Sequence, residues 1–118
     1  MYTDLEDGYA DVRRDDALHK AIIELGAEET YRALQNELAA NPDAGDVIPG
    51  MGGLRKIRLS LPGRGKRGAA RTLYLLFTRA GTIVFLMVYT KNDFEDLPPD
   101  IKKAVRQRIA QIKQEFEP

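Results

Sequence analysis

Residues 54–61 read "LRKIRLSL", and this short stretch decides the fold. Apolar and polar side chains alternate along it, as they do in a strand with one buried face. One face carries three aliphatic residues: Ile57, Leu59 and Leu61. The other face carries Lys56, Arg58 and Ser60. The pattern predicts a strand of an antiparallel sheet that is covered on one side.

Downstream of this strand, two apolar runs predict a hairpin. They are "ARTLYLLFT" (70–78) and "TIVFLMVYTK" (82–91), both rich in β-branched and aromatic residues and separated by Ala80-Gly81. The chain then changes to helical spacing in "DLPPDIKKAVRQRIAQIKQEF" (96–116), with Pro99 near the first turn. The expected apolar stripe of this helix is Ile101, Val105, Ile109, Ile112 and Phe116.

Upstream, the spacing of apolar residues predicts two helices, over residues 16–25 and 27–41, that meet at Gly26. Such a pair forms an αα-hairpin. Residues 42–53 are rich in Gly and Pro and are expected to be a connection. Residues 1–14 show no pattern that predicts a strand, and we expect them to form an N-terminal extension.

The order of these elements predicts the fold class. Two helices, three strands and a helix give an α+β domain, with a helical hairpin and a C-terminal helix on a small antiparallel sheet of at least three strands. We expect the helices to lie on one face of that sheet. The 118 residues are expected to form a single domain, 1–118.

Composition narrows the class of protein. Apolar residues make up 43% of the chain and charged residues 31%, an ordinary mixture for a globular domain. The absence of cysteine excludes disulfides and thiolate metal sites. The acidic segment "MYTDLEDGYADVRRDD" lacks the apolar core of a secretory signal, and the run "IVFLMVY" is far shorter than the roughly 20 residues of a membrane helix. We expect a cytoplasmic protein that does not enter a membrane.

Charge is distributed unevenly along a chain of zero formal net charge. Residues 1–50 hold twelve acidic and four basic side chains, whereas residues 51–118 hold six acidic and fourteen basic ones. The segment 50–71 contains seven Lys or Arg and no acid. Like charges gathered in this way repel one another, so a polyanionic partner is the simplest explanation.

Three segments resemble a known protein family. They are "GDVIPGMGGLRKIR" (45–58), "GRGKRGAARTLY" (63–74) and "VYTKNDFEDL" (88–97). In this order and spacing they are similar to segments of the RelE/HigB toxins, which belong to the RelE/ParE superfamily of bacterial toxin–antitoxin proteins. The resemblance runs from about Tyr31 to Ile112 and implies a RelE/ParE-type fold.

The resemblance also implies a function and partners. It implies a type II toxin that is a ribosome-dependent mRNA endoribonuclease, independent of metals and other cofactors. The partners would be mRNA on the ribosome and a cognate antitoxin, usually one with a helix-turn-helix domain through which operator DNA is bound. Four residues are the catalytic candidates: Lys66, Arg67, Arg71 and Lys91. Four more are expected to bind RNA: Lys56, Arg58, Arg64 and Asn92.

These residue types suit RNA cleavage by an attacking 2′-OH. The reaction needs a proton acceptor, a proton donor and positive charge near the phosphoryl oxygens. Arg stays protonated and clamps phosphate, whereas a Lys crowded by other cations, such as Lys66 or Lys91, could carry a proton. Tyr74 and Tyr89 could stack on a base or could belong to the core. His19, the only histidine, lies outside the three segments, so we exclude it.

Two other functions remain compatible with the sequence. A ParE-like toxin has the same fold but acts on DNA gyrase and needs no RNA chemistry. A module that binds RNA or antitoxin without catalysis would keep the fold and the basic segment. The segments "GKRG" (65–68) and "KND" (91–93) favour the nuclease over the ParE-like toxin, and the cations at Lys66, Arg67, Arg71 and Lys91 favour it over the binding module.

Overall fold

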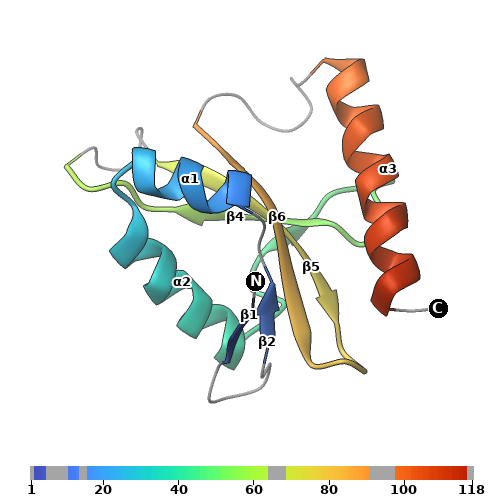
Figure 1. Ribbon diagram of the computed structural model, residues 1–118, viewed down its shortest axis with the longest axis horizontal. Coiled ribbons are helices and arrows are strands. Elements are labelled where there is room, and N and C mark those ends of the chain that lie inside the picture. The colour runs from blue at the N-terminus through green and yellow to red at the C-terminus, as the bar shows by residue number, and fades with distance from the viewer. Residues whose placement is uncertain (1, 5–10, 14–15, 64–68, 91–97, 117–118) are drawn as a thin grey trace.

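The computed structural model describes residues 2–4, 11–13, 16–63, 69–90 and 98–116. The helices in this part of the chain are α1 (Asp16–Glu24), α2 (Glu28–Ala40) and α3 (Pro99–Phe116). The strands are β1 (Tyr2–Asp4), β2 (Asp11–Arg13), β3 (Asp46–Val47), β4 (Arg55–Leu59), β5 (Ala70–Phe77) and β6 (Thr82–Tyr89). Figure 1 shows the sheet between the α1–α2 pair and α3.

The strands form one sheet in the order β1-β2-β6-β5-β4-β3. The pairs β4–β5 and β5–β6 are antiparallel, as expected for a meander of successive strands. The β2–β6 pair is parallel, and the α1–α2 pair and three further strands between these two elements provide the long connection that a parallel pair needs. The predicted α+β fold on a small antiparallel sheet is therefore confirmed, and the sheet gains a parallel strand at one side.

A tight corner at Gly26 joins α1 to α2. The Gly26 N–H donates to the carbonyl of Ile23, and the Ala27 N–H donates to that of Ile22, each over 3.0 Å. This pair of bonds is a Schellman motif, which requires a left-handed residue at its centre. Gly26 has φ 66°, a conformation that costs glycine little. The predicted αα-hairpin is confirmed.

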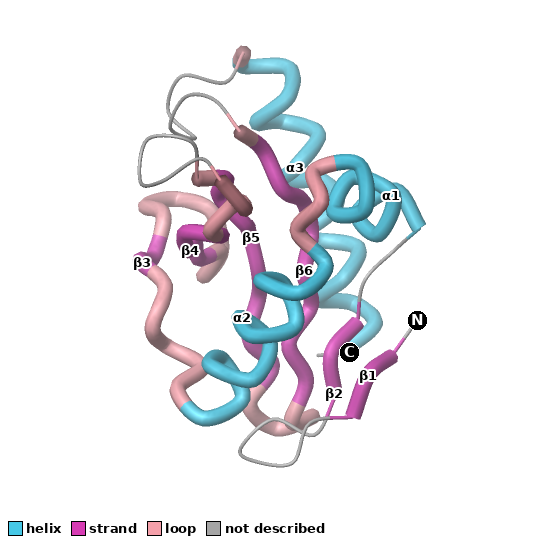
Figure 2. Tube along the Cα trace, turned by 90° about the vertical axis from the view of Figure 1, so that its left-hand side faces the viewer, coloured by secondary structure: helices cyan, strands magenta, loops and turns pink. Residues whose placement is uncertain are grey.

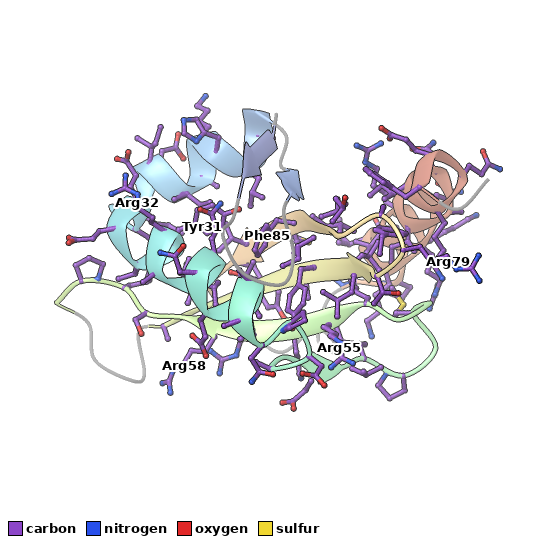
Figure 3. All side chains as sticks on the ribbon, turned by 90° about the horizontal axis from the view of Figure 1, so that it is seen from below. Tyr31, Arg32, Arg55, Arg58, Arg79 and Phe85 are labelled. Carbon is purple, nitrogen blue, oxygen red and sulfur yellow. The ribbon has the colours of Figure 1, made fainter. Side chains whose placement is uncertain are left out.

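The first core cluster lies between the α1–α2 hairpin and one face of the sheet. Helix residues on the hairpin side include Leu18, Ile22 and Tyr31, and the sheet contributes Leu59, Tyr74 and Phe85. The rings of Tyr31 and Phe85 meet edge to face with centroids 5.2 Å apart. Figure 3 shows these two side chains together between α2 and the sheet. In the view of Figure 2, α2 lies in front of β5 and β6.

The second core cluster lies on the opposite face, under α3. It joins Ile109 and Ile112 of α3 to Leu73, Leu75 and Phe77 of β5. Because β5 is apolar on both faces, a single layer of helices could not remove its side chains from water. The expectation that all helices lie on one face was therefore wrong: α3 covers the second face (Figure 1).

Three smaller expectations also differ from the structure. Strands β1 and β2 lie within residues 1–14, where the sequence predicted none, because their backbones pair with each other and with β6 rather than following a local apolar pattern. The connection 42–53 contains the two-residue strand β3. Within the predicted stripe of α3, Ile101 is 39% exposed, whereas Ile109 and Ile112 are buried.

The length and hydropathy of the helices bear on whether any of them could cross a membrane. Within the residues that the structure describes, none of the helices combines the necessary length and apolar character.

Candidate functional site

A row of polar side chains crosses the sheet at one end. Arg58 of β4 is directly opposite Arg71 of β5, and Arg71 is directly opposite Tyr89 of β6. Paired residues of neighbouring strands point to the same face. Leu73, two residues after Arg71, belongs to the core cluster under α3, so the row lies on the α3 face. We call Arg58, Arg71 and Tyr89 the cross-strand row.

A β-bulge in β6 determines which residue completes this row. Leu73 pairs with Met87, but the next residue, Tyr74, pairs with Phe85, so Leu86 is an extra residue in β6. Leu86 and Met87 consequently both pack against the cluster under α3. The extra residue reverses the alternation beyond it and brings Tyr89 beside Arg71.

The row holds two guanidinium groups in adjacent strands. Arg58 is exposed, and Arg71 is half-buried with its Nη1 donating to the carbonyl of Ala70 over 3.3 Å. Lys56, two residues before Arg58, lies on the same face but is directly opposite Asp46 of β3. The cross-strand neighbour of Lys56 is thus an acid, whereas Arg58 and Arg71 are each other's neighbours.

Three of the predicted site residues are thus brought to one face: Lys56, Arg58 and Arg71. Arg64, Lys66 and Arg67 lie outside the described residues, as do Lys91 and Asn92. The described chain nevertheless shows where these two segments attach. Residues 64–68 precede the first residues of β5, and residues 91–97 follow the last residues of β6, so both are joined to the end of the sheet that carries the cross-strand row.

Tyr74, one of the two tyrosines that could have stacked on a base, belongs to the core. It is fully buried on the α1–α2 face, its Oη donates to the carbonyl of Pro42 over 2.9 Å, and it accepts from the Gly45 N–H over 2.8 Å. Burial raises the pKa of Tyr74 above its ordinary value, although the Gly45 hydrogen bond and the charge of Arg55 oppose the shift. Its role is to hold the connection before β4 against the sheet.

Tyr89 is the residue whose position the sequence did not determine. The apolar run "TIVFLMVY" gives no alternation from which a strand face could be assigned. The signal that would have located it is the pairing with Arg71, and that depends on the bulge at Leu86. His19, which the sequence analysis excluded, lies on α1 and so on the opposite side of the sheet from the row.

The chemistry available to the row follows from its side chains. Two guanidinium groups at adjacent positions present planar sets of N–H donors, which match the oxygens of a phosphate better than a single ammonium does. The ring of Tyr89 packs partly against the apolar cluster under α3. The arrangement can hold a phosphate diester beside an aromatic ring.

Comparisons with known proteins bear on the family and the fold of the chain. A family model described as the RelE toxin of the RelE/RelB toxin–antitoxin system matches residues 45–117. Among solved structures, the chain is similar to an arginine-to-alanine double mutant of the E. coli toxin RelE in the free state, with a TM-score of 0.58 and 17% identity. That match covers 83% of this chain and 94% of the other, and at this identity it shows a shared fold.

The family match includes β3 to β6 and all of α3, and so contains every residue of the cross-strand row. It extends over well more than half of the 118 residues. The chain therefore belongs to the family of RelE toxins, the toxin components of toxin–antitoxin systems, and its family implies an antitoxin as partner.

Proposed function

We propose that this toxin is an mRNA endoribonuclease that cuts messages on the ribosome and thereby inhibits translation. One observation carries the proposal: the register places Arg58 directly opposite Arg71. Like charges at directly paired positions destabilise a sheet. A bound phosphate removes that cost by neutralising both guanidinium groups, so the pair is suited to an RNA backbone.

The reaction that we propose is an internal transfer within the RNA. The 2′-oxygen attacks the adjacent phosphorus while the bond from phosphorus to the 5′-oxygen breaks. A base takes the proton of the 2′-OH, and the leaving 5′-oxygen receives a proton. The products are a 2′,3′-cyclic phosphate and a 5′-OH, and the step needs no metal or redox cofactor.

Arg71 and Arg58 are assigned to charge stabilisation in this reaction. Negative charge develops on the phosphoryl oxygens at the transition state, and fixed guanidinium groups lower its energy. Lys66 and Lys91 are the candidates for moving protons, and Arg67 for a further phosphate contact. Arg64, Lys56 and Asn92 are assigned to binding the RNA strand around the cleaved bond.

Dependence on the ribosome follows from the chemistry of the site. Its residues are cations rather than strong bases, so the rate depends on RNA held in the geometry for attack. A ribosome presents mRNA in one fixed conformation, which free RNA does not have. The toxin would accordingly act in the cytoplasm. Its antitoxin would carry a helix-turn-helix domain and bind operator DNA, as in the HigB branch.

The test is expression of the toxin without its antitoxin, followed by mapping of mRNA 5′ ends. Growth arrest with new 5′-OH ends within translated codons is the expected result. Purified toxin should leave the same transcript intact until ribosomes are added. Arrest with intact mRNA and inhibited gyrase would instead identify a ParE-like toxin, and no arrest at all would indicate a binding module.

A further inference from the structure

The chain contains a single serine, and it lies beside the cross-strand row. Ser60 is exposed and is the first residue after β4. Its neighbours Leu59 and Leu61 are both buried in the core cluster on the hairpin side of the sheet. Because successive side chains of an extended chain point to opposite sides, Ser60 points to the α3 side. That is the side on which Arg58 and Arg71 lie.

Two guanidinium groups lie near the Ser60 hydroxyl. Arg58 precedes Ser60 by two residues, so their Cα atoms are separated by about 7 Å along the strand. Arg71 is directly opposite Arg58 in the adjacent strand, which places it diagonally across from Ser60. In Figure 3 the side chain of Arg58 extends from the sheet on the side away from α1. A group attached to the hydroxyl would therefore lie beside both arginines.

The charge around Ser60 suits a phosphoryl group. Ser60 stands within the segment 50–71, which contains seven Lys or Arg and no acid. Asp46 of β3 is opposite Lys56, which is further from Ser60 along β4 than Arg58 is. A phosphoryl group on serine adds a charge of about −1.5 to −2 at pH 7 and three acceptor oxygens. Guanidinium groups bind such oxygens through short, charge-assisted hydrogen bonds.

Ser60 is also accessible to a modifying enzyme. Within the described residues β3 pairs only with Arg55 and Lys56 of β4, so β3 does not cover the outer edge of β4 near Ser60. Pro62 and Gly63, which follow in a turn, are exposed. Cations stand two, four and five positions before the serine. An enzyme with an acidic substrate groove would recognise this segment by charge complementarity.

We propose that Ser60 is a phosphorylation site through which an ATP-dependent protein kinase inactivates the toxin. The hydroxyl oxygen of Ser60 bonds to the γ-phosphorus of ATP, the bond from that phosphorus to the bridging oxygen breaks, and ADP leaves. A base of the kinase takes the hydroxyl proton. The phosphoryl group then binds Arg58 and Arg71 in place of the mRNA phosphate. The inference rests on the proposed function, because it acts by excluding RNA from the site of cleavage.

The contact between the phosphoryl group and the arginines is tested without RNA. Phosphoserine is incorporated at position 60 of the full chain, and phosphorus NMR gives the second pKa of its phosphoryl group. Beside two guanidinium groups this pKa should fall from about 6 to about 5. In the Arg71→Gln background it should return toward its ordinary value. The matched control is phosphoserine in place of Thr78, an exposed residue beside the single exposed Arg79 at the other end of β5, where the pKa should fall less.

Cleavage of mRNA on programmed ribosomes tests the inactivation. Toxin with phosphoserine at position 60 should cut at least about a hundredfold more slowly than unmodified toxin, and phosphatase should restore the rate. The control with phosphoserine at position 78 should cut at the unmodified rate, as should Ser60→Ala. Thermal unfolding verifies that each protein is folded. If the phosphorylated protein does not fold, Ser60→Glu provides the answer, since its single negative charge should make it less toxic to cells than Ser60→Ala.

Mass spectrometry of toxin isolated from its own cells should find a phosphoryl group on Ser60. Its absence from both growing and arrested cells would overturn the proposal. So would a phosphoserine pKa that does not respond to Arg71→Gln, or a Ser60→Ala variant that cuts slowly, because the serine would then belong to the RNA site itself. Failure of the proposed function is seen separately, as wild-type toxin that does not cut mRNA on ribosomes although the pKa of the phosphoserine depends on Arg71.

Discussion

Arg58 and Arg71 are directly opposite each other in neighbouring strands, and the proposed function would give this like-charged pair a use. Directly opposed like charges destabilise a sheet. Neither side chain contributes to the apolar clusters of the described residues. The pair is better suited to a ligand than to the stability of the sheet.

Replacing Arg71 by Ala should abolish toxicity and leave the fold intact. The half-buried guanidinium makes one long hydrogen bond to the Ala70 carbonyl, so its loss should change stability by less than about 1 kcal/mol. The matched control is Arg79→Ala, an exposed arginine just past the other end of β5, which should remain toxic. Figure 3 shows Arg58 and Arg79 at opposite ends of the sheet.

Growth after induction gives the activity of both variants, and thermal unfolding gives their stability. Arg71→Lys should retain partial activity, because an ammonium keeps the charge but loses the bidentate geometry. A toxic Arg71→Ala variant would show that the cross-strand row is not the site of cleavage, whatever the behaviour of Arg79→Ala.

Tyr74 should make stability depend on pH in the alkaline range. Its folded-state pKa is raised above the ordinary value of 10.0, so folding favours the neutral phenol. The contribution is fully present below pH 10 and is lost as pH rises through the folded-state pKa. Denaturant unfolding from pH 8 to 11 should show a decline in unfolding free energy, and Tyr74→Phe should decline less.

The Tyr74→Phe variant should also be less stable than the wild type at pH 7. It leaves the Gly45 N–H and the Pro42 carbonyl without the phenol that now pairs with them, at a cost of about 1–3 kcal/mol. Gly45→Ala should be destabilising as well, because the added Cβ would lie 2.6 Å from the Tyr74 Oη and 2.9 Å from the Lys56 carbonyl. Identical pH profiles for wild type and Tyr74→Phe would contradict the role of this phenol.

At the scale of elements, the sequence predicted correctly the strands, helices and turns whose formation depends on neighbouring residues in the chain. The alternation around Ile57 and Leu59 gave β4 and its two faces, and Gly26 gave the corner between α1 and α2. The N-terminal strands were missed because their existence depends on pairing with β6, far away in the chain. The position of α3 was missed because a helix stripe shows that a face is buried but does not identify the surface that buries it.

The candidate site was predictable to a similar extent. Basic residues in alternation gave Lys56 and Arg58 a common face, and the resemblance to a toxin family pointed to Arg71. Tyr89 could not be assigned, because one extra residue at Leu86 reverses the alternation of β6 and only the register reveals it. The pairing of Lys56 with Asp46 was equally hidden, since these residues meet only through the β3–β4 pair.

The difference in burial between two isoleucines of α3 predicts how much each contributes to stability. Ile109 is 4% exposed within the cluster under α3, whereas Ile101 is 39% exposed on the same helix. Ile109→Ala should lower the unfolding free energy by about 2–4 kcal/mol through lost burial and a residual cavity. Ile101→Ala, the same chemical change, should stay within about 0.5 kcal/mol. Urea unfolding measures the unfolding free energy of both variants. Equal losses of unfolding free energy would mean that α3 does not pack as described.

At the scale of the whole molecule, the charge asymmetry of the sequence becomes an asymmetry between faces. Exposed acids of α2, at Glu28, Glu29 and Glu37, lie on the hairpin side of the sheet. Arg58 lies on the α3 side. A polyanion is therefore attracted to the α3 side of this neutral protein and repelled by the hairpin side.

The association of toxin and antitoxin should therefore depend on salt. An acidic antitoxin segment would be attracted to the face that carries Arg58, which accelerates encounter when charges are weakly screened. The Debye length falls from about 10 Å at 0.1 M salt to about 3 Å at 1 M, so the association rate should fall over this range. The dissociation rate should change much less if apolar burial holds the complex together.

Stopped-flow kinetics across a salt series measures both rates, and two charge variants identify the face that is used. Arg58→Gln should slow association at low salt and converge with the wild type at high salt. Arg32→Gln, which removes an equal charge from an exposed position on α2, should not slow it. Two results would contradict this prediction: an association rate that does not depend on salt, or an Arg32→Gln variant that associates as slowly as Arg58→Gln. Either result would mean that the antitoxin does not bind through the face that carries Arg58. Its inhibition of the toxin would then have to come from contacts elsewhere.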